Sequence, residues 1–149
     1  MPTEDRYLST KYILWIDDDY TKFTGLEAYL YEIPSVDLTS ANSMEEAKLI
    51  LANSAIDLLL FDMVLMKDSL HATLGRRTGM SLVHRALDRG VRLFVAYTVL
   101  AKVEVMSSWE KLLSVIDIDA APKFEYFSKN TSSVTAVVDA VRRLLQEEA

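Results

Sequence analysis

The sequence predicts an α/β fold with a doubly wound, five-stranded parallel sheet, and two observations lead to this prediction. Short apolar runs, too short to be helices, alternate five times with segments whose apolar residues recur at helical spacing. Such alternation is typical of a parallel sheet covered by helices on both faces. The apolar runs also finish next to charged or hydroxyl side chains, and functional groups in such sheets gather where the strands end.

Five predicted strands carry this pattern. Their ranges are residues 12–16, 35–39, 56–61, 91–97 and 115–121. The first strand runs directly into Asp17 and Asp18, the third ends at Asp62, and the fourth ends at Thr98. The fifth is expected to end near Lys123. The sequence therefore predicts one site at the carboxyl edge of the sheet.

Five predicted helices connect and follow the strands. Their approximate ranges are residues 20–31, 43–53, 79–89, 101–113 and 134–145. Ser43 and Glu46 have the spacing of a capping box at the start of the second helix. Gly90 is expected to end the third helix, because glycine is favoured just after a helix. Residues before about Tyr7 are expected to be loose, and residues 63–78 are expected to form a long loop.

Composition limits the possible classes of protein. The 149 residues suit one domain, here residues 1–149, and half of them are apolar. The chain has no cysteine, which excludes disulfides and thiolate metal sites. Its net charge of −6 argues against direct binding of nucleic acid. No apolar run reaches the roughly 20 residues of a membrane span, so we expect a cytoplasmic protein without membrane insertion.

The acidic residues indicate metal-assisted phosphoryl chemistry. Asp17, Asp18 and Asp62 would converge if the first and third strands are neighbours. Two carboxylates about 4 Å apart repel by about 4 kcal/mol at an effective dielectric near 20, so a shared cation or proton is needed. Mg²⁺ is a hard cation that prefers such oxygen ligands, and a carboxylate can itself attack a phosphoryl group. Lys123 and Thr98 would then contact phosphoryl oxygens.

These residues resemble the receiver domain of two-component response regulators over nearly the whole chain, from about Lys11 to the last helix. In that family an acidic pair follows the first strand, matched here by Asp17 and Asp18. The phosphoacceptor ends the third strand, matched by Asp62. A hydroxyl residue ends the fourth strand and a lysine ends the fifth, matched by Thr98 and Lys123. The resemblance implies the flavodoxin-like receiver fold with strand order 2-1-3-4-5.

The resemblance also implies a function. Asp62 would accept a phosphoryl group from a sensor histidine kinase or a histidine phosphotransfer protein. Mg²⁺ would be held by Asp17, Asp18, Asp62 and the backbone carbonyl of Val64. The chain would be no enzyme beyond self-catalysed phosphotransfer and dephosphorylation. Phosphorylation would change the surface formed by the fourth helix, fifth strand and fifth helix, and so signal to a downstream protein target.

Several positions depart from the family pattern. Met66 stands where a proline is usual four residues after the phosphoacceptor. Phe124 follows Lys123 where a cis proline is usual, and Pro122 precedes it. Ala120 occupies the position of the usual aromatic switch residue. Together with the long 63–78 loop, these departures leave open a degenerate receiver that binds a partner without being phosphorylated.

A second alternative is an enzyme. Residues 17–21 read Asp-Asp-Asp-Tyr-Thr, which is similar to the first motif of haloacid-dehalogenase-type phosphohydrolases with Asp17 as nucleophile. The acidic fourth motif of that family is missing, and Asp62 would have no role. The chain ends soon after its last predicted helix, so we expect either a stand-alone receiver that signals by docking or a piece of a longer protein.

Overall fold

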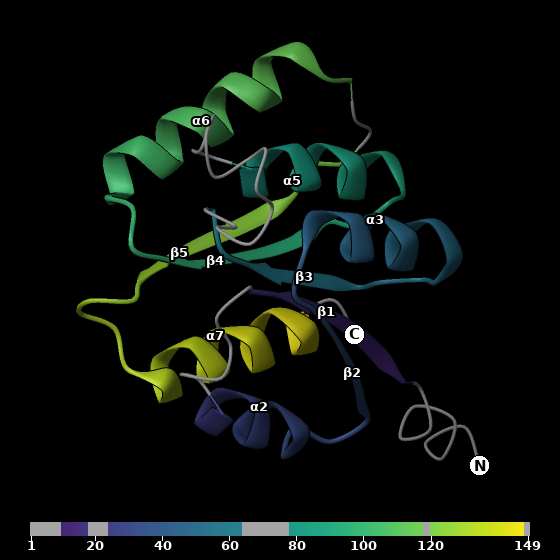
Figure 1. The fold of residues 1–149 in the computed structure, drawn as a ribbon, viewed down its shortest axis with the longest axis vertical. Coiled ribbons are helices and arrows are strands. Elements are labelled where there is room, and N and C mark those ends of the chain that lie inside the picture. The colour runs from purple at the N-terminus through teal and green to yellow at the C-terminus, as the bar shows by residue number, and fades with distance from the viewer. Residues whose placement is uncertain (1–9, 18–23, 64–77, 118–119, 148–149) are drawn as a thin grey trace.

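A five-stranded parallel sheet forms the centre of the computed structural model, which describes residues 10–17, 24–63, 78–117 and 120–147 (Figure 1). The strand order is β2-β1-β3-β4-β5, and every neighbouring pair is parallel. The strands are β1 (Lys11–Ile16), β2 (Val36–Ala41), β3 (Leu58–Phe61), β4 (Leu93–Thr98) and β5 (Lys123–Ser128). The predicted fold class and strand order are confirmed.

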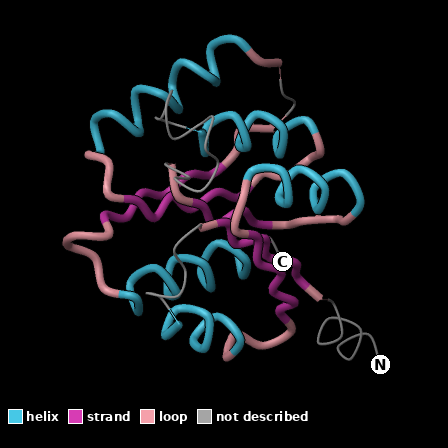
Figure 2. Tube along the Cα trace, viewed as in Figure 1, coloured by secondary structure: helices cyan, strands magenta, loops and turns pink. Residues whose placement is uncertain are grey.

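Helices cover both faces of the sheet, as Figures 1 and 2 show. They are α2 (Thr24–Tyr31), α3 (Met44–Asn53), α5 (Thr78–Asp88), α6 (Lys102–Val115) and α7 (Val134–Glu147). Helices α2 and α7 pack on one face, and α3, α5 and α6 pack on the other. In the described part of the chain, none of these helices has the length and apolar character needed to cross a membrane.

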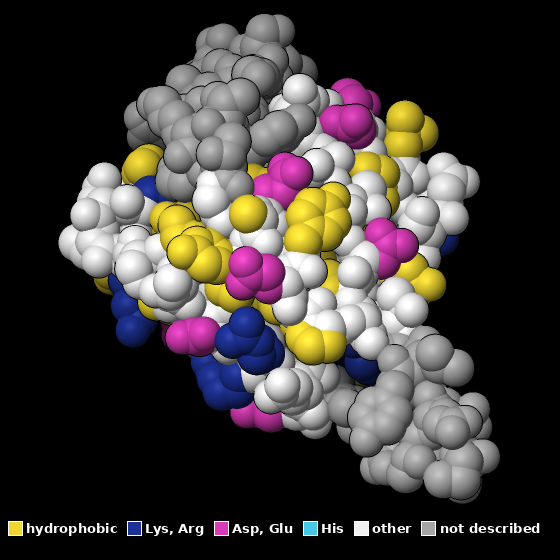
Figure 3. Space-filling view, turned by 90° about the horizontal axis from the view of Figure 1, so that it is seen from below, with side chains coloured by type: hydrophobic (Ala, Val, Ile, Leu, Met, Phe, Trp, Pro, Cys, Tyr) yellow, Lys and Arg dark blue, Asp and Glu magenta, His cyan; other side chains and the backbone are white. Residues whose placement is uncertain are grey.

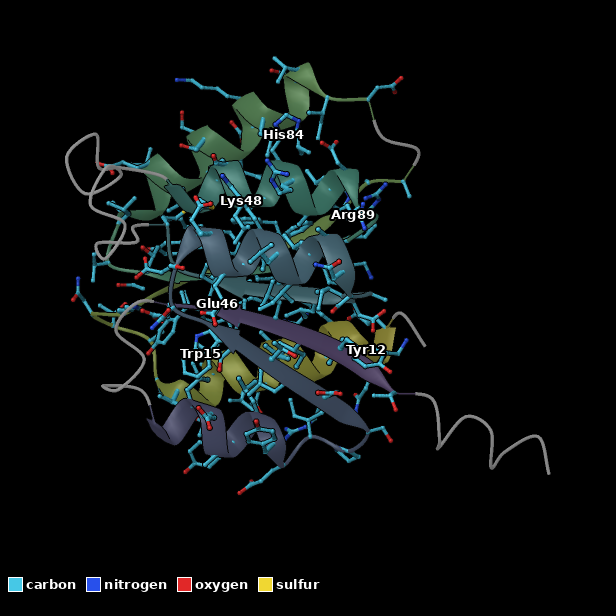
Figure 4. All side chains as sticks on the ribbon, turned by 45° about the vertical axis from the view of Figure 1, so that its right-hand side comes forward. Tyr12, Trp15, Glu46, Lys48, His84 and Arg89 are labelled. Atoms are coloured by element: carbon cyan, nitrogen blue, oxygen red, sulfur yellow. The ribbon has the colours of Figure 1, made fainter. Side chains whose placement is uncertain are left out.

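The sheet separates two hydrophobic cores. Side chains alternate along each strand, so neighbouring residues enter opposite cores. In β1, Leu14 and Ile16 pack toward α3 and α5, whereas Ile13 and Trp15 pack toward α2 and α7. Figure 4 shows Trp15 on the side of α2 and α7. All residues of β3 and β4 are buried, which explains why these strands were recognisable as continuous apolar runs.

The capping box predicted at the start of α3 is present in a shifted form. The Glu46 backbone N–H donates to Ser43 Oγ at 3.2 Å. The return bond joins Glu46 Oε1 to the backbone N–H of Asn42, at 2.9 Å, instead of that of Ser43. Both bonds satisfy donors at the end of β2 and the start of α3, so they fix the turn between the two elements.

The predicted position of the fifth strand is wrong. Residues 115–121 were expected to form it, but Val115 is the last residue of α6 and the strand begins at Lys123. β5 lies at the edge of the sheet, and its last five residues are only partly buried. An edge strand of this kind lacks the continuous apolar run that marked the central strands. The apolar residues within 115–121 therefore gave a misleading signal.

Some predicted features lie outside the described residues. These are the loose N-terminal end, the first residues of the predicted helix at 20–31, and nearly all of the 63–78 loop. The predicted end of the third helix is confirmed, because α5 stops at Asp88 and Gly90 adopts a φ of +94°. This left-handed conformation is one that glycine adopts at little cost.

Arg89, just after α5, joins two helices that cover the same face (Figure 4). Its Nε donates to the Leu51 carbonyl at 3.2 Å, and its Nη2 donates to the Ala52 carbonyl at 2.8 Å. These carbonyls belong to the last turn of α3, where backbone acceptors have no partner inside the helix. The positive charge also lies at the negative end of the α3 dipole.

We predict that Arg89→Ala lowers the free energy of unfolding by about 1–2 kcal/mol, because two charge-assisted hydrogen bonds are lost. Urea unfolding monitored by circular dichroism measures the change. Arg85→Ala is the matched control, since it removes an exposed positive charge from α5 itself. Equal loss in both variants would contradict a specific role for the α3 carbonyls.

Candidate functional site

Three charged residues stand one position beyond the ends of three strands. The backbone N–H of Asp17 donates to the Ala41 carbonyl at 3.2 Å, and that of Asp62 donates to the Ile16 carbonyl at 3.1 Å. The N–H of Lys129 donates to the Thr98 carbonyl at 2.9 Å. Each bond continues the hydrogen-bond ladder of the sheet by one residue. The backbone positions of the site are therefore set by strand register.

The side chains of these residues meet at the carboxyl edge of the sheet. Lys129 Nζ lies 2.6 Å from Asp17 Oδ2 and 2.8 Å from Asp62 Oδ2. The three side chains are almost fully buried, with 8%, 2% and 8% exposure for Lys129, Asp17 and Asp62. The predicted convergence of Asp17 and Asp62 is thus present, and the shared ammonium offsets the repulsion between the carboxylates.

Thr98 completes the group from the end of β4. Its hydroxyl donates to Asp62 Oδ1 at 2.6 Å, and the side chain is buried. The same Oγ1 accepts a longer bond, 3.4 Å, from the backbone N–H of Leu100. Both carboxylate oxygens of Asp62 are therefore engaged, one by a hydroxyl and the other by an ammonium.

The electrostatics favour a charged Lys129. Burial lowers the pKa of its ammonium, but the charges and hydrogen bonds of Asp62 and Asp17 outweigh burial, so the pKa is raised above its ordinary value. A raised pKa means that Lys129 remains protonated at neutral pH. At neutral pH Lys129 therefore contributes its full share to the ion pair, and this share is lost as pH rises through the raised pKa.

Lys123 does not reach this site. It is the first residue of β5 and lies opposite Leu93, the first residue of β4, so it stands at the amino end of the sheet. Its Nζ pairs with Glu147 Oε1 at 3.1 Å on the surface. The prediction that Lys123 ends the fifth strand is wrong because the strand was placed too early. Lys129, which the sequence reasoning missed, directly follows the end of the strand.

The alternating run Lys123-Phe-Glu-Tyr-Phe-Ser128 followed by Lys129 could have revealed the correct lysine. Tyr126 stands three residues before Lys129, at the position that the family pattern gives to an aromatic residue. The supposed departure at Ala120 therefore disappears. The missing proline persists, since Asn130 follows Lys129.

The donor chemistry of the site suits a hard divalent cation. The two carboxylate oxygens of Asp17 and Asp62 already converge on one positive charge, and such oxygens are the ligands that Mg²⁺ prefers. No larger group of acidic or histidine side chains that could hold a metal gathers among the described residues. Asp18 and Val64, the other predicted ligands, lie outside them, as does Met66.

Solved structures of response regulators are similar to this chain in fold. A response regulator receiver domain protein (CheY-like) from Methanospirillum hungatei JF-1 has a TM-score of 0.66 and 22% identity, covering 93% of this chain and 96% of that chain. A two-component response regulator from Clostridium difficile has a TM-score of 0.67 and 17% identity, covering 92% and 97%. This chain has the receiver-domain fold.

A third structure with this receiver fold, a response regulator from Burkholderia pseudomallei, is described with a phosphorylated aspartic acid, a calcium ion and citrate. Its TM-score is 0.62 at 19% identity, covering 93% of this chain and 72% of that chain. No protein-family model matches the sequence, and a search of curated proteins finds no match. The likeness to these structures establishes the receiver fold alone.

We predict that Lys129→Met lowers the free energy of unfolding by about 3–5 kcal/mol at pH 7, because two buried carboxylates lose their shared cation. The pKa of Lys129 is raised, so its contribution is complete below the ordinary lysine value and disappears as pH rises through the folded-state value. The difference between wild type and variant should thus be constant from pH 7 to about 10 and shrink at higher pH. Urea titrations at each pH measure it.

Lys123→Met is the matched control for this experiment. It removes the same charge from an exposed ion pair, whose loss should cost less than about 1 kcal/mol. A larger loss for Lys123→Met than for Lys129→Met would contradict the assignment of the buried lysine.

Proposed function

We propose that this chain is a cytoplasmic phosphoacceptor receiver of two-component signal transduction that is phosphorylated on Asp62 in a Mg²⁺-dependent reaction. The observation that carries the proposal is the arrangement of Asp62 itself. Its carboxylate is held between a buried hydroxyl, Thr98, and a buried ammonium, Lys129, beside the carboxylate of Asp17. The receiver fold supports the same reading, with the whole of residues 1–149 as one receiver domain.

The proposed reaction is transfer of a phosphoryl group from a phosphohistidine of a kinase or phosphotransfer protein. An Asp62 carboxylate oxygen attacks phosphorus, an O–P bond forms, and the P–N bond to the imidazole breaks. The electron pair of that bond stays on the imidazole nitrogen, which takes up a proton. The product is an acyl phosphate on Asp62, and the chain acts as phosphoacceptor with at most self-catalysed transfer and dephosphorylation.

Residues around Asp62 would stabilise the transferred group. Thr98 Oγ1 and Lys129 Nζ now contact the two oxygens of Asp62, so both lie within reach of phosphoryl oxygens attached there. Asp17 and Asp62 would hold Mg²⁺, with Asp18 and the Val64 carbonyl as the further proposed ligands. When bound, the metal would neutralise phosphoryl oxygens during transfer. Donors placed in advance in a buried site stabilise such charge more strongly than water does.

A chain of contacts leads from Asp62 to the surface proposed to bind the downstream protein. Thr98 Oγ1 contacts both Asp62 and the Leu100 backbone N–H, and the Leu100 carbonyl accepts a 2.5 Å bond from the Tyr126 hydroxyl. In α6, Trp109 stacks on Phe124 of β5 with ring centroids 4.4 Å apart. A move of Thr98 toward a phosphoryl group would therefore disturb the segment that precedes α6.

The phosphohydrolase alternative has less support. In that alternative Lys123 would serve as the lysine of the third motif, but it lies at the opposite end of the sheet from Asp17. Asp62, which has no role in that alternative, shares the Lys129 ammonium with Asp17. The degenerate receiver keeps some support from Met66 and from Asn130, which follows Lys129 where the family pattern has a proline.

We predict that acetyl phosphate with Mg²⁺ adds one phosphoryl group, on Asp62, and that Asp62→Asn abolishes the adduct. Intact-mass spectrometry with peptide mapping identifies the modified residue. Asp57→Asn is the matched control, since Asp57 precedes β3 at the opposite end of the strand and should leave labelling unchanged. An adduct on Asp17 would favour the phosphohydrolase, and no adduct at high donor concentration would favour the degenerate receiver.

We also predict that beryllofluoride with Mg²⁺ changes the tryptophan fluorescence through Trp109, because α6 adjoins the segment that contacts Thr98. The chain has only two tryptophans, Trp15 and Trp109, so the source of the signal can be assigned. Trp109→Phe should lose the change. A change of undiminished size in Trp109→Phe would assign the signal to Trp15 in β1 and would argue against a response in α6.

A further inference from the structure

The Lys129 ammonium also lies near an aromatic ring. Its Nζ lies 5.9 Å from the centre of the Tyr97 ring. Tyr97 is the penultimate residue of β4, and only 3% of its surface is exposed. The distance is within the range at which an ammonium is attracted to an aromatic face. No part of the proposed phosphoryl chemistry uses this tyrosine.

The side chains of the last two residues of β4 lie on opposite faces of the sheet, because successive strand residues alternate between faces. Thr98 donates to Asp62. Tyr97 belongs to the core on the side of α2 and α7, which also contains Val137 and Val138 of α7. The ring is therefore held by its own packing, and it offers Lys129 a fixed surface.

Tyr97 is a neutral support for the ammonium. Burial raises the pKa of its phenol, the charge of Asp17 raises it further, and Lys129 opposes both effects. The phenol therefore remains protonated at neutral pH and adds no negative charge to the site.

We propose that Tyr97 is a positioning residue for Lys129 that holds the ammonium between Asp17 and Asp62 and thereby weakens divalent cation binding. The proposal rests on the proposed function, because it takes these carboxylates to be the cation ligands. Lys129 occupies Oδ2 of both aspartates, so an incoming cation must compete with the ammonium for the same oxygens. The more firmly the Lys129 ammonium is held between the carboxylates, the lower the affinity of the site for a divalent cation.

Two ligands should respond in opposite directions when the ring is removed. In Tyr97→Leu, Lys129 is held less firmly, so Mg²⁺ alone should bind about 2- to 5-fold more tightly. Beryllofluoride, added at saturating Mg²⁺, needs Lys129 near Asp62 to contact its fluorides. Its affinity should fall by a similar factor. Simple damage to the fold would weaken both ligands together.

The experiment uses the full chain and isothermal titration calorimetry, first with MgCl₂ and then with beryllofluoride. Tyr97→Phe keeps the ring and should restore both affinities to near wild-type values. Phe94→Leu is the matched control, because Phe94 is another buried aromatic of β4 but packs on the opposite face against Trp109. It should lower stability without producing the opposite shifts. Tyr97→Met provides the same comparison if Tyr97→Leu does not fold.

Several results would overturn the proposal. One is an unchanged Mg²⁺ affinity in Tyr97→Leu, and another is a loss of both affinities like that in Phe94→Leu. If Tyr97→Phe behaved like Tyr97→Leu, the hydroxyl would be responsible instead of the ring. If the wild-type protein bound neither Mg²⁺ nor beryllofluoride, the proposed function would be contradicted as well. If only the variants failed to show the expected shifts, only the role proposed for Tyr97 would be contradicted.

Discussion

The contact of one ammonium with two buried carboxylates is the constraint on which the site depends. Burying a single unpaired carboxylate would cost several kcal/mol, and two neighbouring ones would also repel each other. Lys129 removes both difficulties by bonding to Asp17 and Asp62 at the same time. The fold must therefore bring the ends of β1, β3 and β5 to one edge, with β4 between the last two.

The sheet and its two cores supply this geometry. Residues on one side of the strands pack against α2 and α7, and residues on the other pack against α3, α5 and α6. On the face drawn in Figure 3, described acidic and basic side chains lie among hydrophobic ones. The charges of Asp17, Asp62 and Lys129 lie inside, at the strand ends, where the low dielectric makes each interaction stronger.

The sequence was sufficient to predict the fold class and the convergence of Asp17, Asp62 and Thr98, because buried parallel strands leave clear apolar runs that end at these residues. It was insufficient at β5. This edge strand is half exposed, so its composition does not differ sharply from that of a surface segment. Because the fifth strand was predicted too early in the chain, Lys123 was predicted as the site lysine instead of Lys129. The role proposed for Tyr97 could not be predicted either, because a tyrosine within an apolar strand is typical of a core residue.

Anchoring the charged residues through backbone bonds separates the chemistry from the connecting loops. The N–H groups of Asp17, Asp62 and Lys129 are each tied to a neighbouring strand, before any loop begins. Loops beyond such anchors can lengthen or change composition without displacing the reactive atoms. Loop positions that hold no proposed metal ligand could therefore vary on this scaffold, which is consistent with a shared architecture at only 13–22% identity to similar structures.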